Sequence, residues 1–338
     1  MMESHLIENI TWFTDQAAGE AGEPGIHHSY MKSVATALNY LDEKFDPVWL
    51  MGSSGFAFRI FINVNLCPSA MSIFDFSAIL PEVIEQSGYR AAYFGRYWND
   101  EAHEKIRRDQ AHEAILAGID RNVPAVVWDI YDAEWGLITG YNARGKFYHT
   151  LTHRGEKSTL PFARLGRNGI DILSVAIAGE PNQKTRDEIV FNALKAAVCH
   201  AEQGEWTERG RYQNGLAAYE MWSAFYEKAA MIINAGKGAN IKQDVWDHAA
   251  YHASHHYSAR CYARDFLKMI APGNDALAAA ASLYETAASL LKLVWYAMVI
   301  NRNLNADTLN FLAQQIREAK QAEEKGIRQI NAYLKIST

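Results

Sequence analysis

The stretch Pro124–Tyr148, PAVVWDIYDAEWGLITGYNARGKFY, decides the first half of the fold. Its apolar runs on either side of a polar turn predict two β-strands, at Ala125–Ile130 and Gly136–Tyr141. A Gly-Tyr pair ends the second strand, and a short polar turn leads into a third strand at Lys146–Leu151. Ahead of this stretch, Ser29–Leu41 carries apolar residues at helical spacing, which predicts an amphipathic helix.

The same mixture of periods continues to about residue 180. Phe56–Asn63 and Ile170–Ala178 are apolar runs that predict strands, and Ser77–Ser87 predicts a helix that ends at Gly88. We therefore predict an α+β domain over residues 1–180.

The pattern changes after residue 180, where strand-like runs disappear. Apolar residues at helical spacing predict an all-α domain of about five helices over residues 181–338. The predicted helices are Arg186–Gln203, Leu216–Ile233, Val245–Ile270, Ala276–Asn301 and Thr308–Leu334.

Composition limits the class of protein. The net charge of -6 and the lack of a Lys/Arg run argue against a nucleic-acid partner. We expect no stretch to approach the ~20 apolar residues that span a bilayer, and therefore no membrane partner. The first residues lack the pattern of a secretory signal, and the 3 cysteines have no short spacing. We expect a cytoplasmic protein.

Ordered segments along nearly the whole chain resemble the butirosin-biosynthesis H-protein N-terminal family with its helical C-terminal domain. That family is similar to the papain-like, bacteriocin-processing peptidases. The segments that carry the resemblance are the helix led by His27 with Ala-Leu at 37–38, GSSGFAFR at 52–59, GLITGY at 136–141, GLAAYEMW at 215–222 and RCYARDFLKMIA at 260–271.

The resemblance implies a papain-like fold that transfers or hydrolyses acyl groups. In such a family a Cys at a helix start takes an acyl group from a carrier thioester, and a His accepts its proton. Here the corresponding positions carry His28 or Ser29, and Glu134 replaces the His that would open the strand. The orienting Asn or Asp of the family would fall near His149 or Thr150, neither of which matches. The active site therefore diverges from the family pattern.

The residues themselves leave two interpretations of this helix start. Ser29 is either a nucleophile activated by His28 or Glu134, or the N-cap of the helix. Glu134 beside Trp135 is either an acid or base with a raised pKa, or it forms a solvated turn together with Asp129 and Asp132. We name Ser29, His28 and Glu134 as candidate catalytic residues and Trp135 as a ligand contact.

Two further residues of the first half are candidates. Cys67, in an extended segment before Pro68, is either a reactive thiol or a small buried side chain, and we include it among the catalytic candidates. Arg59 interrupts an apolar run and needs a partner if buried. It either forms an ion pair or binds an anionic group of a ligand, and the partners considered are Asp75, Asp129 and Glu134.

The second half contains four histidines on one stripe of a predicted helix, namely His248, His252, His255 and His256. They form structural hydrogen bonds, line a ligand pocket, or hold a metal. We name His252 and His256 as candidate ligand contacts. We predict neither a metal nor a cofactor, because the pattern shows no third metal ligand.

Two functional hypotheses follow. The first is an acyltransferase-like or amidase-like enzyme that acts on a small molecule or on an acyl group bound to a carrier protein. The second is a catalytically inactive, papain-like protein that binds a small molecule. The aromatic residues of the helical half bury a homodimer interface as readily as a domain interface, so a homodimer remains open.

Overall fold

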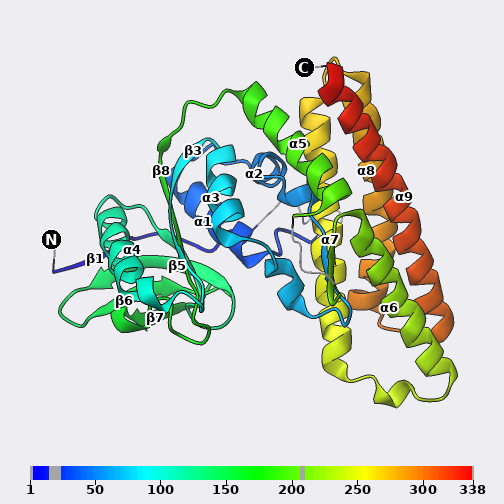
Figure 1. Cartoon of the computed structure of the whole chain (residues 1–338), viewed down its shortest axis with the longest axis horizontal. Coiled ribbons are helices and arrows are strands. Elements are labelled where there is room, and N and C mark those ends of the chain that lie inside the picture. The colour runs from blue at the N-terminus through cyan, green and yellow to red at the C-terminus, as the bar shows by residue number, and fades with distance from the viewer. Residues whose placement is uncertain (1–2, 15–23, 206–209, 337–338) are drawn as a thin grey trace. The chain divides into compact units, whose positions relative to one another are not determined.

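A computed structural model describes residues 3–14, 24–205 and 210–336, and they fall into two units (Figure 1). Unit 1 comprises the described residues of 3–14, 28–50 and 75–184. Unit 2 comprises those of 24–27, 51–74, 185–205 and 210–336. The chain passes from the first unit into the second within helix α2 (Pro47–Ser53).

Unit 1 is built on one antiparallel sheet. Its strands lie in the order β3-β8-β4-β5-β6-β7, and β1 pairs with the far end of β5. The bounds are β1 Ser4–Leu6, β3 Tyr89–Arg96, β4 Ala125–Trp128, β5 Trp135–Asn142, β6 Phe147–Leu151, β7 Lys157–Pro161 and β8 Leu173–Pro181.

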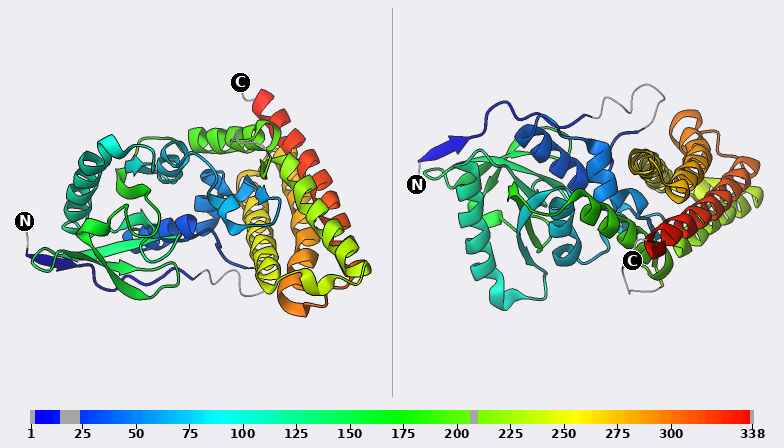
Figure 2. Two further views of the ribbon diagram at one scale, coloured as in Figure 1. Left: turned by 60° about the horizontal axis from the view of Figure 1, so that its bottom comes forward. Right: turned by 90° about the horizontal axis from the view of Figure 1, so that it is seen from above.

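Helices cover both faces of this sheet (Figure 2). Helix α4 (Glu104–Ile119) packs its Ile115 against Val127 and Ile138 on one face. Successive strand residues point to opposite faces, so Trp128 and Trp135 lie on the other one. There they contact α1 (Ser29–Leu41) and α3 (Phe76–Gln86) through aromatic rings. Burial on both faces explains the nearly continuous apolar run of β4.

Unit 2 is a helical bundle with a two-stranded sheet. Contacts join α7 to α8, α8 to α9, and α9 to both α5 and α6. The bounds are α5 Arg186–Gln203, α6 Leu216–Asn234, α7 Gln243–Ile270, α8 Asp275–Trp295 with a π-helical extension Tyr296–Asn301, and α9 Ala306–Ile336. Strands β2 (Phe61–Asn63) and β9 (Tyr212–Asn214) pair antiparallel.

An antiparallel α+β unit and a helical unit thus occur, as expected, but their division along the chain is more complex. Residues 51–74 belong to the helical unit, although they precede most of the sheet in sequence. The predicted strand Phe56–Asn63 is only partly correct, because Phe56–Phe58 forms a 3-10 turn that follows Gly55 at φ 74°. Strand β7 was not predicted, since its sequence KSTLP buries only Leu160.

The expectation that no stretch approaches a membrane-spanning length is wrong for one helix. Asp275–Asn301 is long and apolar enough to cross a membrane by length and composition alone. Packing buries 44% of its most apolar 18-residue window, and core helices of soluble proteins pass the same test. Its contacts with α7 and α9 bury part of this apolar surface.

Candidate active site

Helix α1 begins at Ser29. The hydroxyl of this serine is directed at a carboxylate and not at the helix backbone. The N-cap is His28, whose side chain makes no capping hydrogen bond. The interpretation of Ser29 as N-cap is therefore wrong. Ser29, only 7% exposed, donates its Oγ hydrogen to Oε2 of Glu134.

Glu134 is held at this point by the hairpin of β4 and β5. Trp128 pairs with Trp135 at the end of the β4–β5 ladder that adjoins the connecting turn, and the backbone N–H of Asp129 donates to the Glu134 carbonyl at 2.9 Å. The backbone N–H of Trp135 donates to Oγ of Ser29 at 3.2 Å. The serine hydroxyl therefore has both a fixed donor and a fixed acceptor, which sets the orientation of its lone pairs.

The carboxyl of Glu134 is tuned toward proton acceptance. Burial raises its pKa above the ordinary value of 4.5, and Asp132 acts in the same direction. The hydrogen bond from Ser29 and the charge of His153 oppose this rise in pKa. His153 Nδ1 lies 3.2 Å from Oδ1 of Asp132, so these two side chains form a pair beside the Glu134 carboxyl.

Aromatic rings form one wall of this site. The Trp135 ring lies 4.3 Å from that of Trp128, 5.0 Å from that of Phe76 and 5.5 Å from that of Tyr30, between ring centroids. The imidazole of His28 lies 5.6 Å from Trp135 in the same way. Such surroundings exclude water and strengthen the electrostatic interactions of Glu134.

The alternative that Asp129, Asp132 and Glu134 form a solvated turn is wrong for Asp129, whereas Asp132 is partly exposed. Asp129 is buried at φ 56°, and its Oδ2 accepts hydrogen bonds from the backbone N–H groups of Gly169 and Ile170, both at 2.6 Å. It therefore anchors the loop before β8 to the turn that presents Glu134.

The other candidates of the first half, Cys67 and Arg59, belong to unit 2, whereas Ser29 and Glu134 belong to unit 1. Cys67 is extended, as predicted, and its Sγ accepts a hydrogen bond from Ser69 Oγ at 3.1 Å. Arg59 forms a bidentate ion pair with Glu205 through Nε at 2.7 Å and Nη2 at 2.8 Å. The structural ion pair is thus present, but the partners considered for Arg59 were wrong, because the carboxylate that it binds is that of Glu205.

The imidazoles of His252 and His256 are buried within unit 2. Nε2 of His252 lies 3.3 Å from the carbonyl oxygen of Cys67, and the His256 ring lies 5.2 Å from that of Trp222. Burial lowers the pKa of His252 to about 4 and that of His256 well below 6.5, so both are neutral near neutral pH. No three potential ligand side chains among the described residues are placed to hold a metal.

Unit 1 therefore unites Ser29, His28, Glu134 and Trp135, as the sequence suggested. Phe76, Trp128 and His153, which the sequence analysis missed, complete the site together with Asp132, which it named only as part of a turn. His153 was accessible to prediction through the hairpin. Because β6 runs back along β5 with Leu151 opposite Leu137, the residues after β6 return to the start of β5.

No protein-family model and no curated protein sequence matches this chain. The chemistry of the site is therefore inferred from its geometry.

Proposed function

We propose that unit 1 is a papain-like acyl-transfer or amide-hydrolysing domain in which Ser29 is the nucleophile and Glu134 the general base. The observation that carries the proposal is the direct hydrogen bond from Ser29 Oγ to Glu134 Oε2 at the start of α1. These two residues stand where the family resemblance implies a Cys and a His. A hydrogen-bonded nucleophile and base at a helix start is the arrangement that covalent acyl transfer requires.

The first half-reaction forms an acyl-enzyme. Oγ of Ser29 attacks the carbonyl carbon of a thioester, ester or amide while its proton passes to Oε2 of Glu134. Collapse of the tetrahedral intermediate expels the thiol, alcohol or amine, which takes this proton from Glu134. In the second half-reaction an amine or water attacks the Ser29 ester, its proton passes to Glu134, and the same proton returns to Oγ as the serine leaves.

The start of α1 supplies donors for the negative charge that develops on the carbonyl oxygen. The first hydrogen bond within this helix runs from the Lys32 N–H to the His28 carbonyl at 2.9 Å. The N–H groups of Ser29, Tyr30 and Met31 therefore have no acceptor within the helix. The helix dipole also favours negative charge at this end.

The substrate class that fits is a small molecule or an acyl group carried as a thioester. The second candidate function is a non-catalytic binding protein. It is favoured by the exchange of the family's Cys and His for Ser29 and Glu134, since a carboxylate is a weaker base than an imidazole at neutral pH.

Thioester turnover distinguishes the two. We would measure thiol release from acyl-N-acetylcysteamine thioesters by the full chain and by the variants Ser29→Ala and Glu134→Gln. The matched control is Ser33→Ala, the same substitution at another buried serine of α1. The proposal expects a loss of about 10²-fold or more in both site variants, with the control unchanged.

Equal turnover in Ser29→Ala and the unsubstituted chain overturns the nucleophilic role. No turnover, together with a small molecule that copurifies unchanged, favours the binding protein instead.

A further inference from the structure

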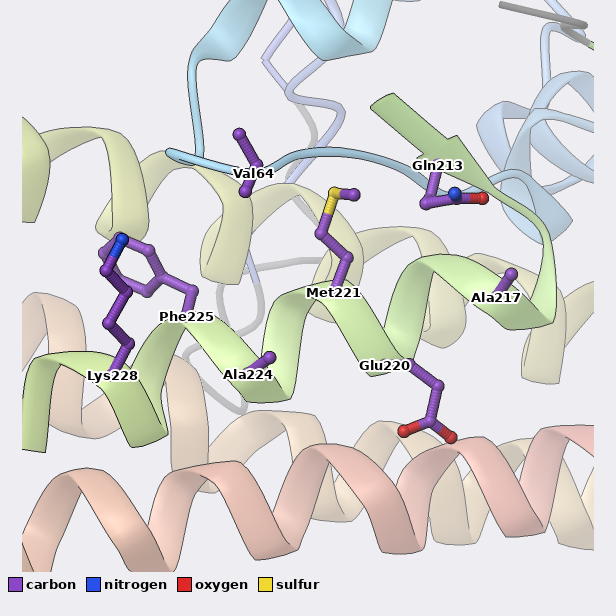
Figure 3. A pocket seen from close by; sticks show the side chains of 8 residues that line it. All are labelled: Val64, Gln213, Ala217, Glu220, Met221, Ala224, Phe225 and Lys228. Carbon is purple, nitrogen blue, oxygen red and sulfur yellow. The ribbon is translucent and has the colours of Figure 1, made fainter. Parts of the chain in front are cut away.

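Helix α6 in unit 2 has a second apolar stripe at the edge of the helical core, where Met221 and Phe225 pack against the core and are only partly buried. Its inner stripe, which includes Tyr219, Trp222 and Tyr226, is buried in the bundle. The next stripe faces a hollow of about 540 Å³ (Figure 3). The hollow is lined by Val64, Gln213, Ala217, Glu220, Met221, Ala224, Phe225 and Lys228.

The centre of this hollow is apolar. Met221 and Phe225 lie one helical turn apart along its floor, and Val64, 42% exposed, lies across from them (Figure 3). Its volume lies within the usual range for small-molecule sites, about 300–1,000 Å³. An adaptable thioether beside an aromatic ring suits a flexible apolar body.

The charges of α6 leave one cation at the end of the hollow. Glu220 forms an ion pair with Lys320 at 2.6 Å, and Glu227 pairs with Arg317. Lys228 is exposed and has no ion-pair partner among the described residues. The acidic side chains on this part of α6 are thus compensated by α9, and the ammonium of Lys228 remains available to an anion.

We propose that this hollow binds a free amphipathic carboxylate, with its apolar body over Met221 and Phe225 and its carboxylate at Lys228. Ala217 and Phe225 are eight residues apart on α6, so the apolar part is about 12 Å long. A saturated chain advances roughly 1.25 Å per carbon, given its ~1.5 Å bonds, so about eight to ten carbons fit. The site lies in unit 2 and does not depend on the reaction assigned to Ser29.

The test uses the full chain labelled with [methyl-¹³C]methionine and three probes that share one chain and differ in the head group. These are decanoate, 1-decanol and decyltrimethylammonium. The Met221 methyl signal is assigned with Met221→Leu. We expect decanoate to shift this signal and to bind more tightly than decanol, and the cationic probe to bind least.

Variants separate the head group from the chain. Lys228→Gln is expected to weaken decanoate by about three- to fivefold, as an exposed ion pair would, and to leave decanol unchanged. Lys325→Gln removes the same charge from an exposed position of α9 that does not line the hollow, so decanoate binding is expected to be unchanged. Phe225→Ala should weaken all three probes.

Three results overturn the proposal. The first is a Met221 signal that decanoate does not move. The second is equal binding of the three probes by the unsubstituted chain, which needs no variant to fold. The third is a Met221 signal that moves with protein concentration alone, because a second copy of the chain would then occupy the hollow.

Discussion

Glu134 shows how one residue's surroundings define its chemistry. On a solvated turn its carboxyl would be a weak base, but burial raises its pKa and the Ser29 hydroxyl is its hydrogen-bond donor. The neighbouring pair of His153 and Asp132 acts on the same carboxyl in opposite directions. The pKa of Glu134 is thus set by burial, by the hydrogen bond from Ser29 and by the charges of His153 and Asp132.

Because the pKa of Glu134 is raised, we expect the free energy of unfolding to fall as the pH rises. The folded chain binds this proton more tightly than the unfolded chain does, so the stabilisation is present below the ordinary pKa of 4.5 and is lost as the pH rises through the raised value. Glu134→Gln removes this dependence. In urea unfolding from about pH 4 to about pH 7, the variant's free energy of unfolding should therefore rise relative to that of the unsubstituted chain. A difference that is constant with pH would show that the carboxyl is not perturbed.

His252 predicts the opposite dependence. Its pKa is lowered from 6.5 to about 4, first by burial and also by His248, while hydrogen bonding to the carbonyls of Cys67 and Leu66 opposes the shift. The stabilisation is complete above about pH 6.5 and is lost as the pH falls toward 4, by up to about 3 kcal/mol. His252→Gln should flatten the fall of thermal stability in this window. A fall as steep as that of the unsubstituted chain would assign the effect to other groups, such as buried His256, whose ring lies 5.7 Å from that of His252.

Between elements, a buried ion pair ties the helices of unit 2 together. Arg260 of α7 donates to both carboxylate oxygens of Glu323 in α9, at 2.8 and 2.9 Å. Tyr219 of α6 donates to the same carboxylate, and Arg260 also donates to the carbonyl of Arg59 at 2.7 Å. The side chains of this network are all buried in unit 2, and their hydrogen bonds fix α6, α7 and α9 in position along one another.

Breaking this pair should be costly. Glu323→Gln leaves the Arg260 guanidinium buried without its counterion, so we expect a loss of about 3–5 kcal/mol in the free energy of unfolding. The matched control is Glu324→Gln, which removes the neighbouring carboxylate from its exposed pair with Arg328 and should cost less than about 0.5 kcal/mol. Similar losses in the two variants, measured by denaturant unfolding, would refute a structural role for the buried pair.

The helices could be predicted from sequence more fully than the short strands. Arg186–Gln203 and Ser29–Leu41 were predicted to the residue, because apolar spacing and a capping box at Thr185 act locally. Strands β2 and β9 have three residues each, and their pairing depends on residues far apart in the chain. The turn at Phe56–Phe58 follows Gly55 at positive φ and precedes Arg59, whose partner Glu205 lies 146 positions away and could not be predicted from local sequence.

At the scale of the whole molecule, the chain interleaves its two units. The segment 51–74 leaves the sheet-bearing unit and joins the helical one, where Arg59 pairs with Glu205. A single boundary near residue 180 describes the later crossing but not this earlier one. Sequence patterns predict which elements form, whereas the assignment of 51–74 depends on contacts with residues more than a hundred positions away.

The candidate site was predicted in part. The resemblance placed Ser29 and Glu134 at the positions of the family's Cys and His, and a hydrogen bond joins the two side chains in the structure. Cys67, Arg59, His252 and His256 belong to unit 2, whereas Ser29 and Glu134 belong to unit 1. Arg59 stands in an apolar run because it forms an ion pair with Glu205. His252 and His256 are buried in the helical core of unit 2.

Whether Ser29 is an activated nucleophile can be read from the intact mass of the full chain after exposure to a phosphonofluoridate, an electrophile that reacts with activated serines. We expect one stable adduct that survives denaturation and maps to Ser29. It should be lost in Ser29→Ala, strongly slowed in Glu134→Gln and unchanged in Ser33→Ala. An unmodified chain, or an adduct that persists in Ser29→Ala, would contradict the claim that Ser29 is an activated nucleophile.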